Sequence, residues 1–142
     1  MATVNTMTQE PTATLGDQRF VSLTTFKRNG EAVAAPMWIG RDGDDVFVWT
    51  PSDSWKVKRV RNNARVLLAP SNRFGKVRAG APAVEGNARV VTDPATVQRL
   101  QGVIRRKYGL EYRLVTLVET LAARGRKPRV ILLIATSPEQ PN

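Results

Sequence analysis

Short runs of alternating or fully apolar residues, separated by turn-forming residues, predict a chain built mainly of β-strands. Six segments fit this pattern: 20–27, 31–39, 45–50, 64–70, 83–91 and 129–136. Asn29-Gly30 joins the first two, and this dipeptide is typical of a tight hairpin because the turn requires positive φ. Pro36 marks an edge or a bulge in the second, since proline cannot donate to a strand ladder. The last segment is apolar almost throughout and is therefore expected to lie centrally in the sheet.

Helical spacing and capping residues predict three helices between these strands. Ser54 is a good N-cap for a helix over 55–62. Asp93 followed by Pro94 starts a second helix, which Gly109 ends. A third helix over 111–123 is expected to turn one apolar stripe inward, made of Tyr112, Val115, Val118 and Leu121.

These elements together predict a mainly β fold, a six-stranded antiparallel split β-barrel with short flanking α-helices. The length of 142 residues favours one domain, which we place at 17–136. A mobile N-terminal tail over 1–16 and a C-terminal tail over 137–142 are expected to flank it.

Two residue types that carry much of enzyme chemistry are absent, because the chain has no histidine and no cysteine. Histidine-dependent triads, cysteine nucleophiles, disulfides and zinc sites built from these side chains are therefore excluded. Gly75-Lys76 lacks the flanking residues of a P-loop, and no GxGxxG motif follows a strand. If the protein is an enzyme, a bound cofactor must supply the chemistry, while the chain supplies binding and orientation.

The chain carries 22 Lys and Arg against 12 Asp and Glu, a formal net charge of +10. This balance favours anionic partners such as nucleic acid, an acidic membrane surface, or a phosphorylated or carboxylated small molecule. No apolar run is long enough to suggest a transmembrane helix, and the N-terminus lacks a secretory signal pattern. We therefore expect a cytoplasmic protein without a membrane partner or a metal site.

The most informative stretch, residues 46–68, is expected to form a strand, a tight loop, a short basic helix and a second strand. The free N–H groups and the positive dipole end of that helix suit a phosphate. Thr50 and Ser54 place hydroxyls beside this end, and Lys56 lies in the first turn. Cations there oppose the helix dipole, and a bound anion would remove the conflict. A simpler alternative stays open, namely a Ser-capped helix with a solvated basic face.

Four segments carry a resemblance to a known superfamily: LTTFKRNGEAVAAPMWIG (23–40), VWTPSDSWKVKRVRNNARVLLAP (48–70), VEGNARVV (84–91) and KYGLEYRL (107–114). In combination they resemble the pyridoxamine 5′-phosphate oxidase-like, or FMN-binding split-barrel, superfamily. The chain is most similar there to the actinobacterial flavin/deazaflavin oxidoreductases, whose members mostly use coenzyme F420. The resemblance thus implies the same split-barrel fold and a flavin or deazaflavin cofactor.

The resemblance also implies which residues bind that cofactor. Its phosphate is expected to be bound by Thr50, Ser54 and Lys56, with Lys58 and Arg61 in the same basic element. The flat ring system is expected to lie on the strand of Pro36, Met37 and Trp38.

Members of the superfamily are dimeric, with the cofactor in the groove between two barrels, so a homodimer is implied. Three cations are then expected to act across the groove: Arg73, Lys76 and Arg78. Trp55 stands where the family often has glycine, and it is expected to narrow the phosphate entrance.

The implied reaction is hydride transfer between the deazaflavin C5 of F420 and a conjugated small-molecule electron acceptor. Three alternatives remain: an FMN enzyme on the same fold, a non-enzymatic flavin or F420 binder, and a nucleic-acid-binding barrel. The last depends on net charge alone, because the chain lacks an obvious aromatic stacking platform interleaved with Lys and Arg. The residues assign neither the substrate nor a catalytic group.

Overall fold

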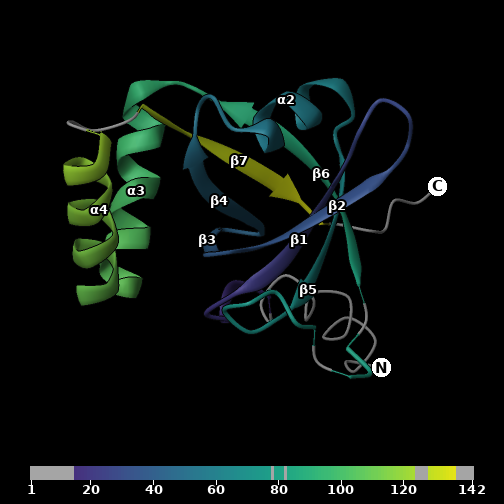
Figure 1. The fold of residues 1–142 in the computed structure, drawn as a ribbon, viewed down its shortest axis with the longest axis horizontal. Coiled ribbons are helices and arrows are strands. Elements are labelled where there is room, and N and C mark those ends of the chain that lie inside the picture. The colour runs from purple at the N-terminus through teal and green to yellow at the C-terminus, as the bar shows by residue number, and fades with distance from the viewer. Residues whose placement is uncertain (1–14, 78, 82, 124–127, 137–142) are drawn as a thin grey trace.

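A computed structural model of the chain describes residues 15–77, 79–81, 83–123 and 128–136 (Figure 1). The expected tails fall largely outside this part, at 1–14 and 137–142. Its strands are β1 (Val21–Phe26), β2 (Ala32–Met37), β3 (Gly40–Asp42), β4 (Asp45–Pro51), β5 (Arg65–Pro70), β6 (Val84–Val91) and β7 (Arg129–Ala135). Its labelled helices are α2 (Trp55–Asn62), α3 (Pro94–Tyr108) and α4 (Leu110–Ala123).

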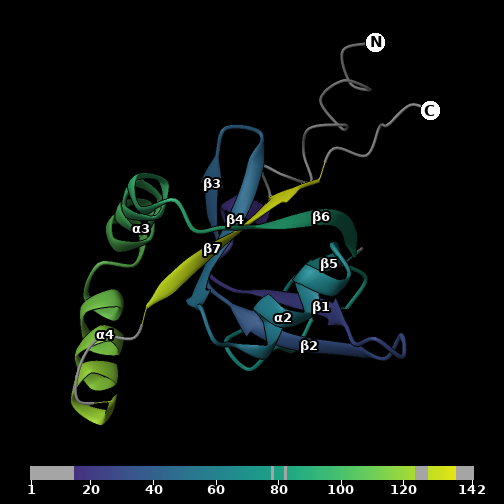
Figure 2. The same cartoon turned by 90° about the horizontal axis from the view of Figure 1, so that it is seen from above.

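These strands form one antiparallel sheet in the order β2-β1-β5-β6-β7-β4-β3. Strands β2 and β3 lie at opposite edges of this order, yet only Trp38 and Ile39 join them along the chain. The sheet must therefore curl until its two edges approach each other, as the view from above shows (Figure 2). The predicted mainly β split barrel is confirmed. Strand β7 is central as expected, since it pairs with β6 on one side and β4 on the other.

The sheet contains one strand more than the six predicted, because the expected strand over 31–39 ends at Met37 as β2 and a further short strand, β3, begins at Gly40. The chain pairs with β1 as far as Met37 and then with β4 from Gly40 onward. Strand β3 lies between the expected strands over 31–39 and 45–50, where no strand is predicted. The continuous segment from β2 through β3 therefore provides both edge strands of the curled sheet.

Side chains from the end of α3 stabilise the bend between β2 and β3. The amide of Ile39 donates to the Tyr108 hydroxyl at 3.0 Å, and Lys107 Nζ donates to the Ile39 carbonyl at 2.7 Å. Trp38 stacks on the Tyr108 ring with 4.4 Å between centroids. Because buried backbone groups must be paired, these contacts replace the ladder bonds that Ile39 loses by leaving the sheet.

Lys107 also anchors the segment before β1. Its Nζ donates to the carbonyls of Gly16 at 2.8 Å and Gln18 at 2.6 Å. Burial, and then the neighbouring charge of Arg19, lowers the pKa of Lys107 to about 8. Leu15 is 1% exposed and belongs to the core, so packing begins within the segment expected to be a tail.

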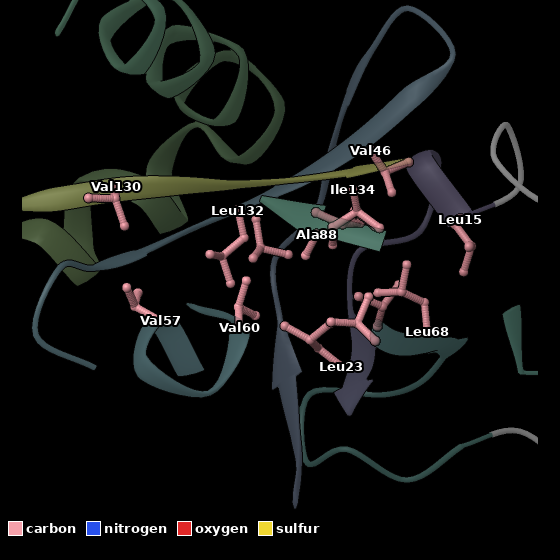
Figure 3. Packing of buried hydrophobic residues seen from close by; sticks show 14 residues of the cluster. Leu15, Leu23, Val46, Val57, Val60, Leu68, Ala88, Val130, Leu132 and Ile134 are labelled. Atoms are coloured by element: carbon pink, nitrogen blue, oxygen red, sulfur yellow. The ribbon is translucent and has the colours of Figure 1, made fainter. Parts of the chain in front are cut away.

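The core consists of two clusters on the two faces of the curled sheet. The first fills the barrel and includes Leu15, Leu23, Val57, Val60, Leu68 and Leu132 (Figure 3). The second lies beneath α3 and includes Phe47, Trp49, Leu100, Ile104, Tyr108 and Ile131. Successive side chains of β4 face the two clusters in turn, with Val46 and Val48 in the first and Phe47 and Trp49 in the second, because side chains alternate between the faces of a strand.

The predicted helix ends are confirmed. The Ser54 Oγ accepts from the Val57 amide at 3.4 Å, and Asp93 Oδ2 accepts from the Thr96 amide at 3.0 Å. Gly109 ends α3 with φ 52°, a conformation that favours glycine. None of the helices in the described part of the chain is long and apolar enough to cross a membrane.

Helices α3 and α4 lie side by side on one flank of the barrel (Figures 1 and 2), and α4 contacts the sheet through Tyr112 and Glu119. Of the stripe predicted to face inward, only Tyr112 does so, and it stacks on Trp49. Val115, Val118 and Leu121 are 41%, 62% and 71% exposed, so the prediction is wrong for them. The physical reason is that α4 has a neighbour on one side only, so most of its apolar surface lies outside the core.

Candidate functional site

The end of β4 and the start of α2 form a corner at which two hydroxyls meet. Thr50 is 1% exposed, and its hydroxyl donates to Ser54 Oγ at 3.3 Å. The same oxygen accepts from the Val57 amide at 3.4 Å. Because Ser54 Oγ accepts both bonds, its own proton remains to be donated to a ligand. The first-turn amides of Trp55 and Lys56, which have no intrahelical acceptor, lie at the same end.

Two cations lie one turn apart beside this corner. Lys56 is half-buried, and burial followed by the nearby charge of Arg59 lowers the pKa of Lys56. Arg59 is fixed in place, because its Nε donates to Thr25 Oγ1 on β1 at 2.8 Å. The first turn of α2 holds no acidic residue that would compensate these charges. A bound anion would do so and would favour the protonated form of Lys56.

A basic hollow lies along the side of α2 that carries Trp55 and Arg59. Trp55 is 67% exposed, and Lys58 Nζ lies 4.2 Å from the centroid of the indole ring. A cavity of about 500 Å³ lies there, lined by Lys27, Arg28, Trp55, Lys58, Arg59 and Asn62. Ligand pockets commonly have volumes of roughly 300–1,000 Å³, so the hollow can accept part of an anionic small molecule.

The residues expected to line the cofactor ring point in different directions. Pro36 is exposed on the edge strand β2, whereas Met37 packs against the barrel core. Trp38 packs against the second cluster through its stack on Tyr108. Within the described residues, no hydrogen bond, ion pair or ring contact joins these three to the corner of Thr50, Ser54 and Lys56.

The loop after β5 is a folded turn that lies against β2. Asn72 Oδ1 accepts from the amides of Phe74 at 2.9 Å and Lys76 at 3.0 Å. Gly75 has φ 86°, and a Cβ added there would lie 3.3 Å from Pro36 Cδ. The loop is therefore positioned by its own hydrogen bonds and by the edge strand.

This turn presents its cations outward. Arg73 and Lys76 are exposed, and Phe74 between them is 83% exposed. Arg78 lies outside the described residues. Arg61 is exposed at the end of α2, two residues before the helix cap.

The structure adds residues that the candidate set lacked. Arg59 lies one turn after Lys56, so helical spacing could have included it. Thr25 carries no signal in the sequence, since only the fold brings β1 to α2. Lys27 and Arg28 form a basic pair before the hairpin turn, and their proximity to Trp55 depends on the curl of the sheet.

The assembled groups suit anion binding and orientation rather than acid–base chemistry. The corner offers hydroxyls, unpaired amides and partly desolvated cations, which together favour a phosphate. Across the described residues, no group of three or more His, Cys, Asp and Glu side chains could hold a metal ion.

Comparison with known proteins places the fold. A family model described as pyridoxamine 5′-phosphate oxidase matches residues 7–138. No curated protein matches the chain in sequence. Among solved structures, a conserved hypothetical protein from Mycobacterium tuberculosis has TM-score 0.64 at 19% identity, covering 89% of this chain and 78% of its own.

Two further structures have names that refer to a cofactor. One named F420 reductase has TM-score 0.55 at 18% identity, covering 86% of this chain and 90% of its own. A FAD-binding protein from Mesorhizobium loti has TM-score 0.59 at 20% identity, and the match covers 92% of this chain and 88% of that protein. At such identities these structures share the fold, whereas the family model spans nearly the whole chain. The chain therefore belongs to the pyridoxamine 5′-phosphate oxidase family.

Proposed function

We propose that the protein is an F420-dependent oxidoreductase whose β4–α2 corner binds the phosphate of the cofactor. The observation that carries the proposal is the pairing of Thr50 and Ser54 at a helix N-terminus, one turn from Lys56 and Arg59. Burying a lysine beside an arginine destabilises the charged form of the lysine unless an anion is bound. A phosphate would receive hydrogen bonds from the hydroxyls, the amides and Lys56 together.

The basic hollow next to the corner supports F420 as the cofactor. F420 carries a phosphodiester and a glutamate tail, and therefore several negative charges. The hollow of Lys27, Arg28, Lys58 and Arg59 would attract such a tail, and Trp55 would cover it. Exposed charges of this kind act over roughly 10 Å and are screened by salt. Cofactor affinity should therefore fall as salt rises.

FMN is the second candidate, because the phosphate corner would serve either cofactor. A fold-level neighbour is a FAD-binding protein and another is named F420 reductase, so relatives point to both cofactor classes. The number of cations around Trp55 favours the more highly charged F420.

A homodimer completes the proposed site. The turn of Arg73, Phe74 and Lys76 projects from the sheet edge, and it would reach the cofactor bound to a second barrel. Pro36 and Met37 lie beside this turn and would face the cofactor ring in the same groove.

When bound, the deazaflavin supplies hydride transfer at C5 to or from a conjugated small-molecule acceptor. The chain's own groups would fix the cofactor by its phosphate and so align the ring with the acceptor. Proton delivery would come from water or a hydroxyl, because the chain has no histidine.

Fluorescence titration with oxidised F420, and separately with FMN, tests the proposal at low and moderate salt. We expect F420 to bind with a Kd of about 1 μM or less and to weaken with salt. Reduced F420 should then be oxidised by some member of a panel of quinones, tetrapyrroles and other conjugated acceptors. Flavin that co-purifies and is released on denaturation would favour FMN, and failure to bind either cofactor would refute the proposal.

A further inference from the structure

Helix α4 exposes four leucines in a row. Leu110, Leu114, Leu117 and Leu121 are 76%, 62%, 55% and 71% exposed. We call these four residues the leucine seam. The opposite side of the helix is occupied, since Tyr112 stacks on Trp49 and accepts a hydrogen bond from Gln101. The helix therefore has one packed side and one apolar side without a neighbour among the described residues.

The spacing within the seam is the spacing of a coiled coil. Steps of four, three and four residues place Leu110 and Leu117 at d positions and Leu114 and Leu121 at a positions of one heptad frame. Such a frame presents knobs to a second helix of the same period. A helix that packs on a core shows the same stripe, so the spacing suits a helical partner and the choice of partner depends on the symmetry and charge of the seam.

The seam is also symmetric about its centre. Read from either end the steps are identical, so an antiparallel copy sets Leu110 opposite Leu121 and Leu114 opposite Leu117. A two-fold contact requires this self-complementarity. Opposed helix dipoles further favour the antiparallel arrangement.

We propose that the leucine seam docks antiparallel against the α4 seam of a second copy of this chain. The seam and the adjacent Val118, which is 62% exposed, form a contiguous apolar patch, and such patches on single proteins are often functional. A stable interface buries about 800 Å² per partner, so the seam would form the apolar centre of a contact to which flanking residues also contribute.

Charge supports a second copy over a membrane surface. Helix α4 contains Glu111, Arg113 and Glu119 as its only charged residues, in a chain of net charge +10. Two copies can thus approach through α4 without the repulsion that their basic faces would produce. A helix that lies on an anionic membrane is instead rich in Lys and Arg on its polar face.

This contact is separate from the proposed cofactor groove. Helices α3 and α4 lie side by side on one flank of the sheet, apart from α2 (Figure 2). Tyr112 of α4 belongs to the second core cluster, whereas Val57 and Val60 of α2 belong to the first. The inference does not depend on the cofactor assignment. If the barrels also pair, the α4 contact joins those pairs into a larger assembly.

Light scattering coupled to size exclusion tests the contact on the full chain. We expect Leu114→Gln/Leu117→Gln to halve the particle mass, while F420 affinity and circular dichroism stay as in the wild type. Val115→Gln is the matched control, because Val115 is also exposed on α4 but lies outside the seam. An unchanged mass in the double variant overturns the proposal, as does a monomeric wild type.

Engineered cysteines test the orientation, since the chain has none of its own. Antiparallel packing predicts that Leu110→Cys/Leu121→Cys forms a covalent dimer under mild oxidation. Leu110→Cys alone should not, because the two copies of residue 110 would lie about 16 Å apart along the helix axis. A dimer from the single variant contradicts the antiparallel arrangement. Wild-type binding to phosphatidylserine vesicles that is lost in Leu114→Gln/Leu117→Gln would assign the seam to a membrane.

Discussion

The hydroxyl of Thr50 donates to the Ser54 hydroxyl oxygen at 3.3 Å, and this bond connects the end of β4 to the N-cap of α2. The distance is long for a bond between hydroxyls, which usually measures about 2.7–2.8 Å. Both oxygens can therefore reorient toward a ligand at little cost. The short loop between β4 and α2 thus places hydroxyls, backbone amides and cations close together at the start of the helix.

Ser54 carries two roles that substitutions can separate. Ser54→Ala should lower the free energy of unfolding by about 1 kcal/mol, the usual cost of losing an N-cap, and should also weaken cofactor binding. Ser54→Asp should restore the cap and stability, yet bind the cofactor still more weakly because its carboxylate repels a phosphate. Urea unfolding and fluorescence titration of both variants measure the two effects. Wild-type affinity in Ser54→Asp would remove Ser54 from the phosphate site.

Lys56 should make cofactor binding dependent on pH. Its pKa is lowered by burial and by Arg59, and a bound phosphate would raise it again. Binding therefore favours the protonated amine of Lys56. Cofactor affinity should be highest below the pKa that Lys56 has in the free protein, and it should fall as the pH rises through that pKa. The loss should begin at a lower pH than for an ordinary lysine. Titration of F420 from pH 7 upward measures it, with Lys56→Arg as the control that stays charged and should remain nearly flat.

Tyr108→Phe tests the bend between β2 and β3. The change leaves the Ile39 amide without its 3.0 Å acceptor in a buried position. An unsatisfied buried group costs about 1–3 kcal/mol, so the free energy of unfolding should fall by that amount. Tyr112→Phe is the control, because the Tyr112 hydroxyl bonds a partly exposed Gln101 side chain and should cost less. Equal losses in urea unfolding would argue against a special role for Tyr108.

Two glycines should respond to alanine in opposite directions. A Cβ at Gly40 would lie 2.5 Å from Phe47 Cζ, so Gly40→Ala should destabilise by about 1–3 kcal/mol through overpacking. A Cβ at Gly102 in α3 would meet only Arg106 Nη1 at 3.5 Å. Gly102→Ala should therefore stabilise by about 0.5–1 kcal/mol through helix propensity. Thermal unfolding of both variants checks the signs, and a destabilised Gly102→Ala would contradict the packing described at α3.

The sequence predicts those parts of the fold that local chemistry decides. The strands, the hairpin at Asn29-Gly30, and the caps at Ser54 and Asp93 follow from periodicity and side-chain chemistry, and the structure confirms them. The corner of Thr50, Ser54 and Lys56 could be located for the same reason, since its members lie within one short stretch of chain. Whether they bind a cofactor stays a prediction.

Features that depend on distant contacts could not be predicted. The bend between β2 and β3 depends on Lys107 and Tyr108, which come from a helix far along the chain. Thr25 joins the site through its hydrogen bond with Arg59, a contact that periodicity along the chain does not encode. The apolar stripe of α4 predicts burial, but sequence alone cannot distinguish a stripe that faces the core from one that faces outward.

The Kd of oxidised F420 for the wild type, Lys56→Ala and Arg106→Ala tests most directly whether the β4–α2 corner binds the cofactor phosphate. Arg106 is exposed on α3, so its substitution removes the same charge away from the corner. We expect Lys56→Ala to bind about tenfold or more weakly, as loss of a charged hydrogen bond implies, and Arg106→Ala to bind as the wild type does. Equal Kd values for Lys56→Ala and the wild type, or equal losses in the two variants, would contradict the phosphate assignment.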